Sequence, residues 1–185
     1  MRVKEYVAES VIAAGTLPLG SEDAAKLAQR LQGLVGADVP IHTIDCFDVS
    51  HFQGRSIVGS CIRFHGGKPD KNLFRRFRVR TLKDQDDYAA LRELVTRRYK
   101  SADELPDLIL IDGGKGQLSA VRAVLPDAHC VALAKKEERL FGSHIDGVHL
   151  EVSSEPGRSL IALRDYAHHF AIQYHRLLRS KSDTW

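Results

Sequence analysis

The chain has 185 residues, of which 43% are hydrophobic, and 27 Lys and Arg against 24 Asp and Glu give it a net charge of +3. A chain of this length forms one domain, or one domain with a short appendage. No stretch reaches the ~18 consecutive apolar residues of a membrane-spanning helix, which excludes a spanning protein. The N-terminal Met1-Arg2-Val3-Lys4-Glu5 is not followed by an apolar signal segment, so we expect no export and no membrane partner.

The three cysteines are Cys46, Cys61 and Cys130. Their number is odd and no two of them are closely spaced, which argues against a disulfide framework and against a Cys-rich zinc site. We therefore expect a cytoplasmic protein.

Basic residues form four clusters, although any single cluster is most simply a solvated face. The clusters are Arg75, Arg76, Arg78 and Arg80; Arg97, Arg98 and Lys100; Lys135, Lys136 and Arg139; and Arg176, Arg179 and Lys181. Because phosphate neutralisation adds up over contacts, four clusters on different elements favour a polyanionic partner.

Residues 1–38 are predicted to form an N-terminal helical appendage or linker. The run Ser21-Glu22-Asp23, with its two acidic residues, is typical of a helix start, and leucines spaced by three and four residues follow before Gly36. The pattern changes after Pro40, so we place the functional domain at residues 39–185.

The rest of the chain alternates between strand and helix patterns. Strands are predicted at 41–50, 57–64, 73–81, 108–111 and 130–134, a hairpin at 140–152 around Asp146-Gly147, and helices at 84–99, 115–125 and 158–179. Short connections make the first three strands an antiparallel meander, whereas the uniformly apolar 108–111 is typical of a central strand. This order predicts an α/β fold, with helices on both faces of one mixed sheet.

Two acidic residues occupy positions where a buried carboxylate is expected. Asp48 shares a strand face with Ile44 and Cys46, and Asp112 follows the apolar run 108–111. Burial of an unpaired carboxylate is costly, so a positive charge must lie nearby. A Mg²⁺ or Mn²⁺ ion would meet that need, because such ions prefer oxygen ligands.

Each acid also has a purely structural interpretation. Asp112 could cap the following helix or pair with an arginine, and Asp48 could be a turn residue. Both acids, however, terminate predicted strands that we expect to be neighbours in the sheet, which favours a shared site.

The run Gly113-Gly114-Lys115-Gly116 suggests a phosphate-binding loop but does not match one. The Ser or Thr after the lysine is missing, and so is the four-residue gap after the first glycine. A helix that begins here still presents free backbone N–H groups to an anion. We therefore predict a nucleic-acid phosphate at this turn, with Lys115 as a further contact.

The last predicted helix carries a polar stripe beside its apolar one. The stripe consists of Arg164, His168, Ile172, His175 and Arg179. By itself, His168 is most simply a hydrogen-bonded boundary histidine. Beside two acids, it becomes a candidate third metal ligand or proton-transfer group. Arg164, His175 and Arg176 are predicted to contact phosphates.

Five segments with specific motifs occur along the chain. They are Cys46-Phe47-Asp48-Val49-Ser50-His51-Phe52-Gln53-Gly54, Asp86-Asp87-Tyr88-Ala89-Ala90-Leu91, Arg97-Arg98-Tyr99, Pro106-Asp107-Leu108-Ile109-Leu110-Ile111-Asp112-Gly113-Gly114-Lys115-Gly116-Gln117-Leu118 and Arg164-Asp165-Tyr166-Ala167-His168-His169-Phe170-Ala171-Ile172. In order and spacing they resemble the C-terminal endonuclease region of UvrC, the incision subunit of bacterial nucleotide excision repair. The resemblance covers roughly residues 41–180.

The resemblance implies an RNase H-like fold with Asp48, Asp112 and His168 as a catalytic and metal-binding triad. It also implies cleavage of the damaged DNA strand on the 5′ side of a lesion, dependent on Mg²⁺ or Mn²⁺. Asp87 lies at another acidic position that the family preserves, but it begins a helix and could simply favour the helix dipole. The implied partners are damaged duplex DNA and UvrB, the latter through regions that this sequence does not contain.

The sequence departs from the family pattern near the last helix. Tyr166 stands where the family usually has an acid, and residues 151–158 replace the family's approach to the helix. The GIY-YIG half, the UvrB-contacting helices and the helix-hairpin-helix end are not visible, so we expect a fragment or a stand-alone relative. Two alternatives stay open: a nucleic-acid-binding module that keeps the fold without cutting, and an interaction scaffold without a DNA role.

Overall fold

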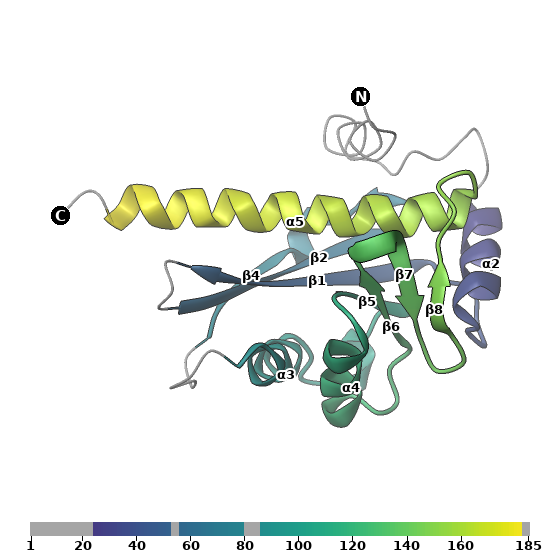
Figure 1. Cartoon of the computed structure of the whole chain (residues 1–185), viewed down its shortest axis with the longest axis horizontal. Coiled ribbons are helices and arrows are strands. Elements are labelled where there is room, and N and C mark those ends of the chain that lie inside the picture. Colours follow the sequence, from purple (N-terminus) through teal and green to yellow (C-terminus); the bar gives the residue numbers. More distant parts are fainter. Residues whose placement is uncertain (1–23, 53–55, 80–85, 183–185) are drawn as a thin grey trace.

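The computed structural model describes residues 24–52, 56–79 and 86–182. Their eight strands form one mixed sheet, with helices on both faces (Figure 1). This arrangement confirms the predicted α/β fold class. None of the helices in the described ranges combines the length and the apolar character needed to cross a membrane.

The strands and helices follow the predicted order with small changes in their ends. The strands are β1 Thr43–Phe52, β2 Ser56–His65, β3 Lys68–Pro69, β4 Arg75–Arg78, β5 Leu108–Asp112, β6 Cys130–Ala134, β7 Arg139–Phe141 and β8 Asp146–His149. The α-helices are α2 Ala24–Val35, α3 Asp87–Arg98, α4 Lys115–Val124 and α5 Glu155–Ser182. Short 3₁₀ turns cover Lys71–Leu73, Ala102–Glu104 and Lys136–Glu138.

The sheet combines antiparallel edges with a parallel centre. The strand order is β3-β2-β1-β5-β6-β7-β8, and β4 pairs with β2 beside β3. The first strands form the predicted antiparallel meander, whereas β1, β5 and β6 run parallel. The three parallel strands therefore bring their carboxyl ends to one edge of the sheet, where ligands bind in open α/β sheets.

Two hydrophobic cores sandwich the sheet. In Figure 1, α5 lies along one face, and α3 and α4 lie along the other. Within β5, Leu108 and Leu110 pack in the α5 core, and Ile109 and Ile111 pack in the α3–α4 core. The uniformly apolar sequence of β5 thus reflects burial on both faces.

Helix α2 belongs to the core on the α5 side. Leu27, Leu31 and Val35 are buried in that core, and Arg30 forms an ion pair of 2.6 Å with Glu155 at the start of α5. The predicted boundary after residue 38 is therefore wrong for this helix, whose apolar face needs the domain to cover it. The remaining part of the predicted appendage, residues 1–23, lies outside the described residues.

The predicted hairpin forms, but its turn lies earlier than Asp146-Gly147. The turn is at residues 142–145, where the Gly142 amide donates to the Ile145 carbonyl at 2.8 Å. Asp146 and Gly147 belong to β8, and Gly147 has a φ of +72°, a conformation that glycine adopts without strain. The glycine signal thus marked an irregular strand start instead of the turn.

Candidate active site

Asp48 and Asp112 lie where β1 and β5 separate. The parallel pairing of these strands ends at Phe47 and Ile111, one residue before each acid. β5 ends at Asp112, whereas β1 continues to Phe52, paired only with β2. The prediction that Asp48 terminates its strand is therefore wrong: it terminates the pairing with β5, which brings it to the same edge.

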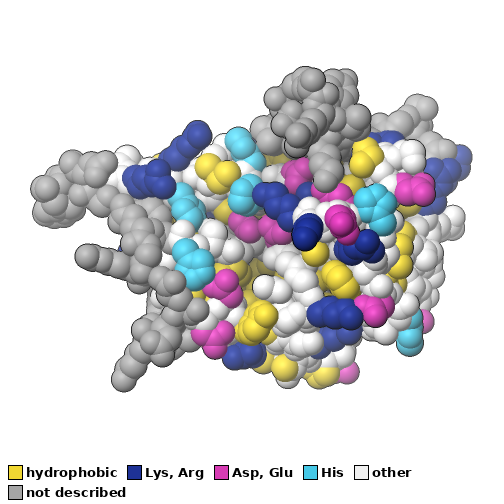
Figure 2. Space-filling model, in the orientation of Figure 1, with side chains coloured by type: hydrophobic (Ala, Val, Ile, Leu, Met, Phe, Trp, Pro, Cys, Tyr) yellow, Lys and Arg dark blue, Asp and Glu magenta, His cyan; other side chains and the backbone are white. Residues whose placement is uncertain are grey.

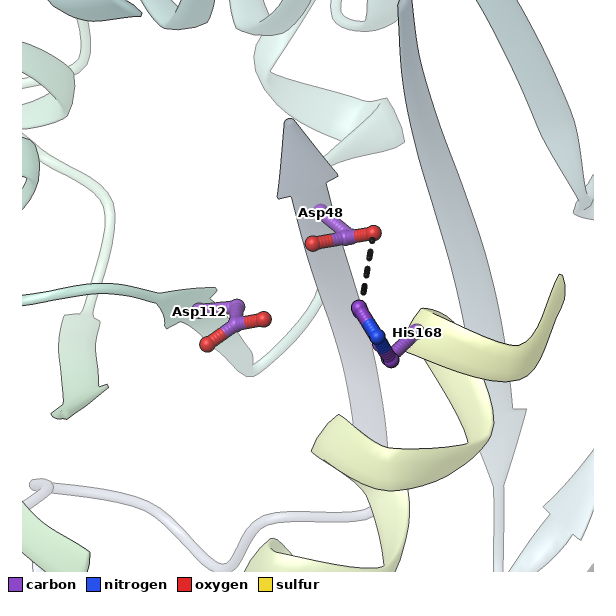
Figure 3. A group of neighbouring side chains, drawn as sticks. All are labelled: Asp48, Asp112 and His168. Atoms are coloured by element: carbon purple, nitrogen blue, oxygen red, sulfur yellow. Dashed lines mark ion pairs between the residues drawn. The ribbon is translucent and has the colours of Figure 1, made fainter. Parts of the chain in front are cut away.

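His168 reaches the two acids from α5. Ala167 and Ala171 are buried against the sheet, which leaves His168 at the border of that face. One ligand atom from each of Asp48, Asp112 and His168 can be chosen so that all three lie within 4.8 Å of one another. His168 Nδ1 is 3.7 Å from Asp48 Oδ2, and Figure 3 shows the three side chains converging from different elements.

The Asp48 carboxylate is nearly inaccessible to solvent yet incompletely satisfied. Its side chain is 5% exposed, and neither its Oδ2 nor His168 Nδ1 has a hydrogen-bond partner among the described residues. Buried polar atoms without partners are costly. A cation between these groups would compensate both atoms.

Asp48 contributes to the raised pKa values of both Asp112 and His168. Burial and the Asp48 charge raise the pKa of Asp112 to about 6, and the nearby Arg164 and His168 oppose that rise. The Asp48 carboxylate holds the pKa of His168 above its ordinary value, against the effect of burial. Two crowded carboxylates beside one imidazole form a site of excess negative charge, which fits a divalent ion.

Asp112 does not cap the following helix, and Asp48 is not a turn residue. The N-cap of α4 is Gly114, and the side chain of Gln117 accepts the hydrogen bond of its amide at 3.0 Å. Asp112 is therefore not the cap. Asp48 is not a turn residue either, because it lies inside β1 opposite Ser60.

Arg164 points into the protein, so its predicted phosphate contact is wrong. Its side chain is 3% exposed and forms a two-pronged ion pair with Glu138, and Asp165 accepts a further hydrogen bond at 2.9 Å. Glu137 and Glu138 both have positive φ, at 62° and 50°. The buried pair therefore fastens a strained turn after β6 to α5, one helical turn before His168.

The other predicted phosphate contacts lie closer to solvent. His175 Nε2 is 2.7 Å from Ser50 Oγ, and burial together with Arg179 lowers the pKa of His175. Arg176 is exposed, and Lys115 is exposed beside Asp146, at 2.5 Å. His175, Arg176 and Lys115 stay predictions as phosphate contacts.

Asp87 does not join the group of three. It begins α3, where its carboxylate lies 2.7 Å from His51 Nε2. Successive side chains of a strand point to opposite faces of the sheet. His51 therefore lies on the α3 side, whereas Ser50 lies on the α5 side. The His51 contact was not predicted, although an acid at a helix start and a histidine late in a strand were both visible.

Sequence reasoning also missed Glu138 and Ser50. Glu138 follows β6, whose carboxyl end is at the same edge as Asp112, so the reasoning used for the two acids could have found it. Ser50 shares a β1 face with Asp48, and its partner His175 was already in the predicted polar stripe. The sequence alone could not show that Glu138 pairs with Arg164 or that Ser50 contacts His175.

Tyr166, the departure from the family pattern, packs away from the acids. Its ring makes edge-to-face contacts with Phe64 at 5.4 Å and Phe74 at 6.1 Å between ring centroids. Arg76 stacks on Phe170 one turn later, 4.3 Å from its ring centroid. This aromatic cluster holds α5 against β2, so Tyr166 supports the helix that carries His168.

The basic clusters differ in exposure. The Arg98 side chain is 7% exposed and lies 3.6 Å from Asp45, whereas Arg176, Arg179 and Lys181 are exposed on α5. Arg80 lies outside the described residues. Figure 2 shows histidines and acidic side chains gathered on the viewed face, with Lys and Arg side chains around them.

The sheet order and the covering helices define an α/β domain of the RNase H-like class. A family model described as the UvrC RNase H endonuclease domain matches residues 32–172. The chain belongs to this family, which confirms the resemblance found in the motifs.

The curated relatives are longer proteins. UvrABC system protein C of Methanosarcina barkeri is 41% identical over 85% of this chain and 32% of its own length. The protein of the same name from Chlorobaculum tepidum is 48% identical over 74% of this chain and 23% of its length. The chain thus spans about a third or less of these relatives.

Among solved structures, the catalytic domain of human endonuclease V matches with a TM-score of 0.47 and 15% identity. The match covers 98% of this chain and 96% of that domain.

Proposed function

We propose that this chain is a divalent-metal-dependent DNA endonuclease whose site consists of Asp48, Asp112 and His168. The observation that carries the proposal is the convergence of three ligand atoms within 4.8 Å at the carboxyl edge of the sheet. The buried Asp48 Oδ2 and His168 Nδ1 support it, because they face each other at 3.7 Å without a hydrogen bond and both are potential ligands. Membership of an endonuclease family supports the reaction class.

Asp48 and Asp112 would hold the ion, and His168 would complete its shell or transfer a proton. A bound Mg²⁺ or Mn²⁺ supplies Lewis-acid activation of water and offsets charge on the scissile phosphate. The two carboxylates are fixed in place, because β1 and β5 hold their backbones and Asp48 is buried. The half-exposed His168 faces solvent on its other side, so it could pass a proton to or from a bound strand.

The surrounding cations would position the DNA backbone. His175 and Arg176 follow His168 along α5, and Lys115 begins α4 after Asp112. Arg164 acts indirectly, since its buried pair with Glu138 fixes the helix that carries His168. Phosphate contacts from two elements would orient one strand across the acids.

The biological reaction we propose is incision of the damaged strand, 5′ of a lesion, in nucleotide excision repair. The relatives that support it are named UvrABC system protein C. The substrate would be damaged duplex DNA and the setting the cytoplasm, with UvrB as a partner of the complete system. The burial of all three cysteines as free thiols agrees with a reducing compartment.

The test is nicking of lesion-bearing supercoiled DNA in the presence of Mn²⁺. We expect Asp48→Ala, Asp112→Ala and His168→Ala each to abolish nicking. His169→Ala is the matched control, because His169 neighbours His168 but bonds to Gln173 instead of the acids. Nicking that persists in all three site variants would refute the proposed site.

A further inference from the structure

A groove of about 420 Å³ lies between α4 and the β7–β8 hairpin. Its polar and aromatic lining includes Lys115, Ser119, Arg122, Phe141, Ser143 and Asp146. One end of the groove, at Lys115, is three residues from Asp112. The groove therefore begins next to the candidate active site, and the proposed function leaves it unexplained.

Both ends of the groove carry a cation. Lys115 Nζ is 2.5 Å from Asp146 Oδ1, and at the other end Arg122 Nη2 donates to Ser143 Oγ at 2.8 Å. The two cations are seven residues apart along one face of α4, which corresponds to about 10 Å. The Ser119 hydroxyl lies on the same wall between them. The polar lining thus suits an anion with further hydrogen-bonding groups.

Phe141 adds an aromatic surface to this lining. Its ring centroid is 5.6 Å from Lys115 Nζ, and Gly147 packs so closely that an added Cβ would come within 3.3 Å of the ring. A cationic groove with an aromatic ring is the combination that binds single-stranded nucleic acid, because phosphates contact the cations and bases stack on the ring.

We propose that this groove holds an unpaired nucleotide of the cleaved strand, with its phosphate at Lys115 and its base against Phe141. The proposal rests on the proposed function, which brings a DNA strand to Asp112. Asp146 occupies the place on Lys115 that a phosphate would take. Both partners are exposed, at 65% and 77%, so a phosphate can displace the carboxylate at little cost.

The test is an NMR titration of the ¹⁵N-labelled chain with the dinucleotide pTpT in EDTA. We expect shifts of the Ser119, Arg122 and Ser143 amides. Asp146→Asn should tighten binding by about 2- to 5-fold, the effect of a surface ion pair. Arg122→Gln and Phe141→Leu should weaken it, and Lys26→Gln on α2 should leave it unchanged as the charge-matched control.

The variants are expected to change the affinity for pTpT in opposite directions, which makes the result decisive. Asp146→Asn removes only the charge of an exposed side chain and is not expected to disturb folding, so it tests the proposal even if a Phe141 variant unfolds. Shifts confined to residues outside the groove, or an Asp146→Asn variant that binds no tighter, would overturn it. Because EDTA removes the ion needed for cleavage, the outcome is independent of nicking, and either proposal can fail alone.

Discussion

Asp48 is the first residue of β1 beyond its pairing with β5, and Asp112 is the last residue of β5. The two carboxylates thus meet where the neighbouring strands part, and the sheet itself holds them together. Their repulsion is built into the fold, which makes the metal-free protein less stable than its packing alone would allow.

Asp112→Asn should stabilise the metal-free protein by about 1–2 kcal/mol at pH 8, because it removes a carboxylate whose pKa is raised to about 6. Since the folded state binds the Asp112 proton more tightly than the unfolded state, this group favours folding below about pH 4. The contribution is lost as the pH rises through about 6. Urea unfolding in EDTA should therefore show a gain at pH 8 and none at pH 4. A loss of stability at pH 8 would contradict the account.

Mn²⁺ should stabilise the wild-type protein by neutralising the same acids. At about 100 times its dissociation constant, the ion should raise the melting temperature by about 5–10 °C. Asp48→Asn and Asp112→Asn should lose most of this shift, whereas the control His169→Gln should keep it. The affinity should fall as the pH drops through about 6, because protonation of Asp112 competes with the ion. Equal shifts in all variants would place the ion elsewhere.

Arg164→Met should destabilise the fold by about 3–5 kcal/mol, because it removes the guanidinium that compensates the buried Glu138 charge. The double variant Arg164→Met/Glu138→Leu should recover most of that loss, since two apolar side chains of similar size need no compensation. A double-mutant cycle in urea measures the coupling directly. Additive losses would mean that the pair does not act as a unit.

Gly59→Ala should loosen the packing of α3 against the sheet. An added Cβ would lie 1.9 Å from Leu94 Cδ2, and Leu94 is fully buried. We expect a loss of about 1–3 kcal/mol from overpacking. Adding Leu94→Ala should remove the clash, so Gly59→Ala should cost less in that background than alone. An unchanged cost would indicate backbone strain instead.

Periodicity and burial patterns predicted most of the fold. The uniformly apolar β5 and the alternating β1 placed the strands, and the parallel pairing that followed brought Asp48 and Asp112 to one edge. The hairpin turn and the role of α2 could not be read in this way. A glycine signal does not say whether it marks a turn or an irregular strand, and an amphipathic helix does not say what covers it.

The candidate site was predictable where a residue's role depends on its own element. The strand or helix position of Asp48, Asp112 and His168 was enough to predict their role, and the structure brings the three side chains together. For Arg164 it was not enough, because its partner Glu138 lies on a distant turn and the pair exists only in the folded protein. A cation beside a site looks the same in sequence whether it faces phosphate or a buried carboxylate.

The most direct test of the central claim is a crystal soaked in Mn²⁺ and measured for anomalous scattering. The account predicts one or more anomalous peaks within coordination distance of Asp48, Asp112 and His168. Occupied manganese sites elsewhere, with no peak between the two carboxylates, would contradict it.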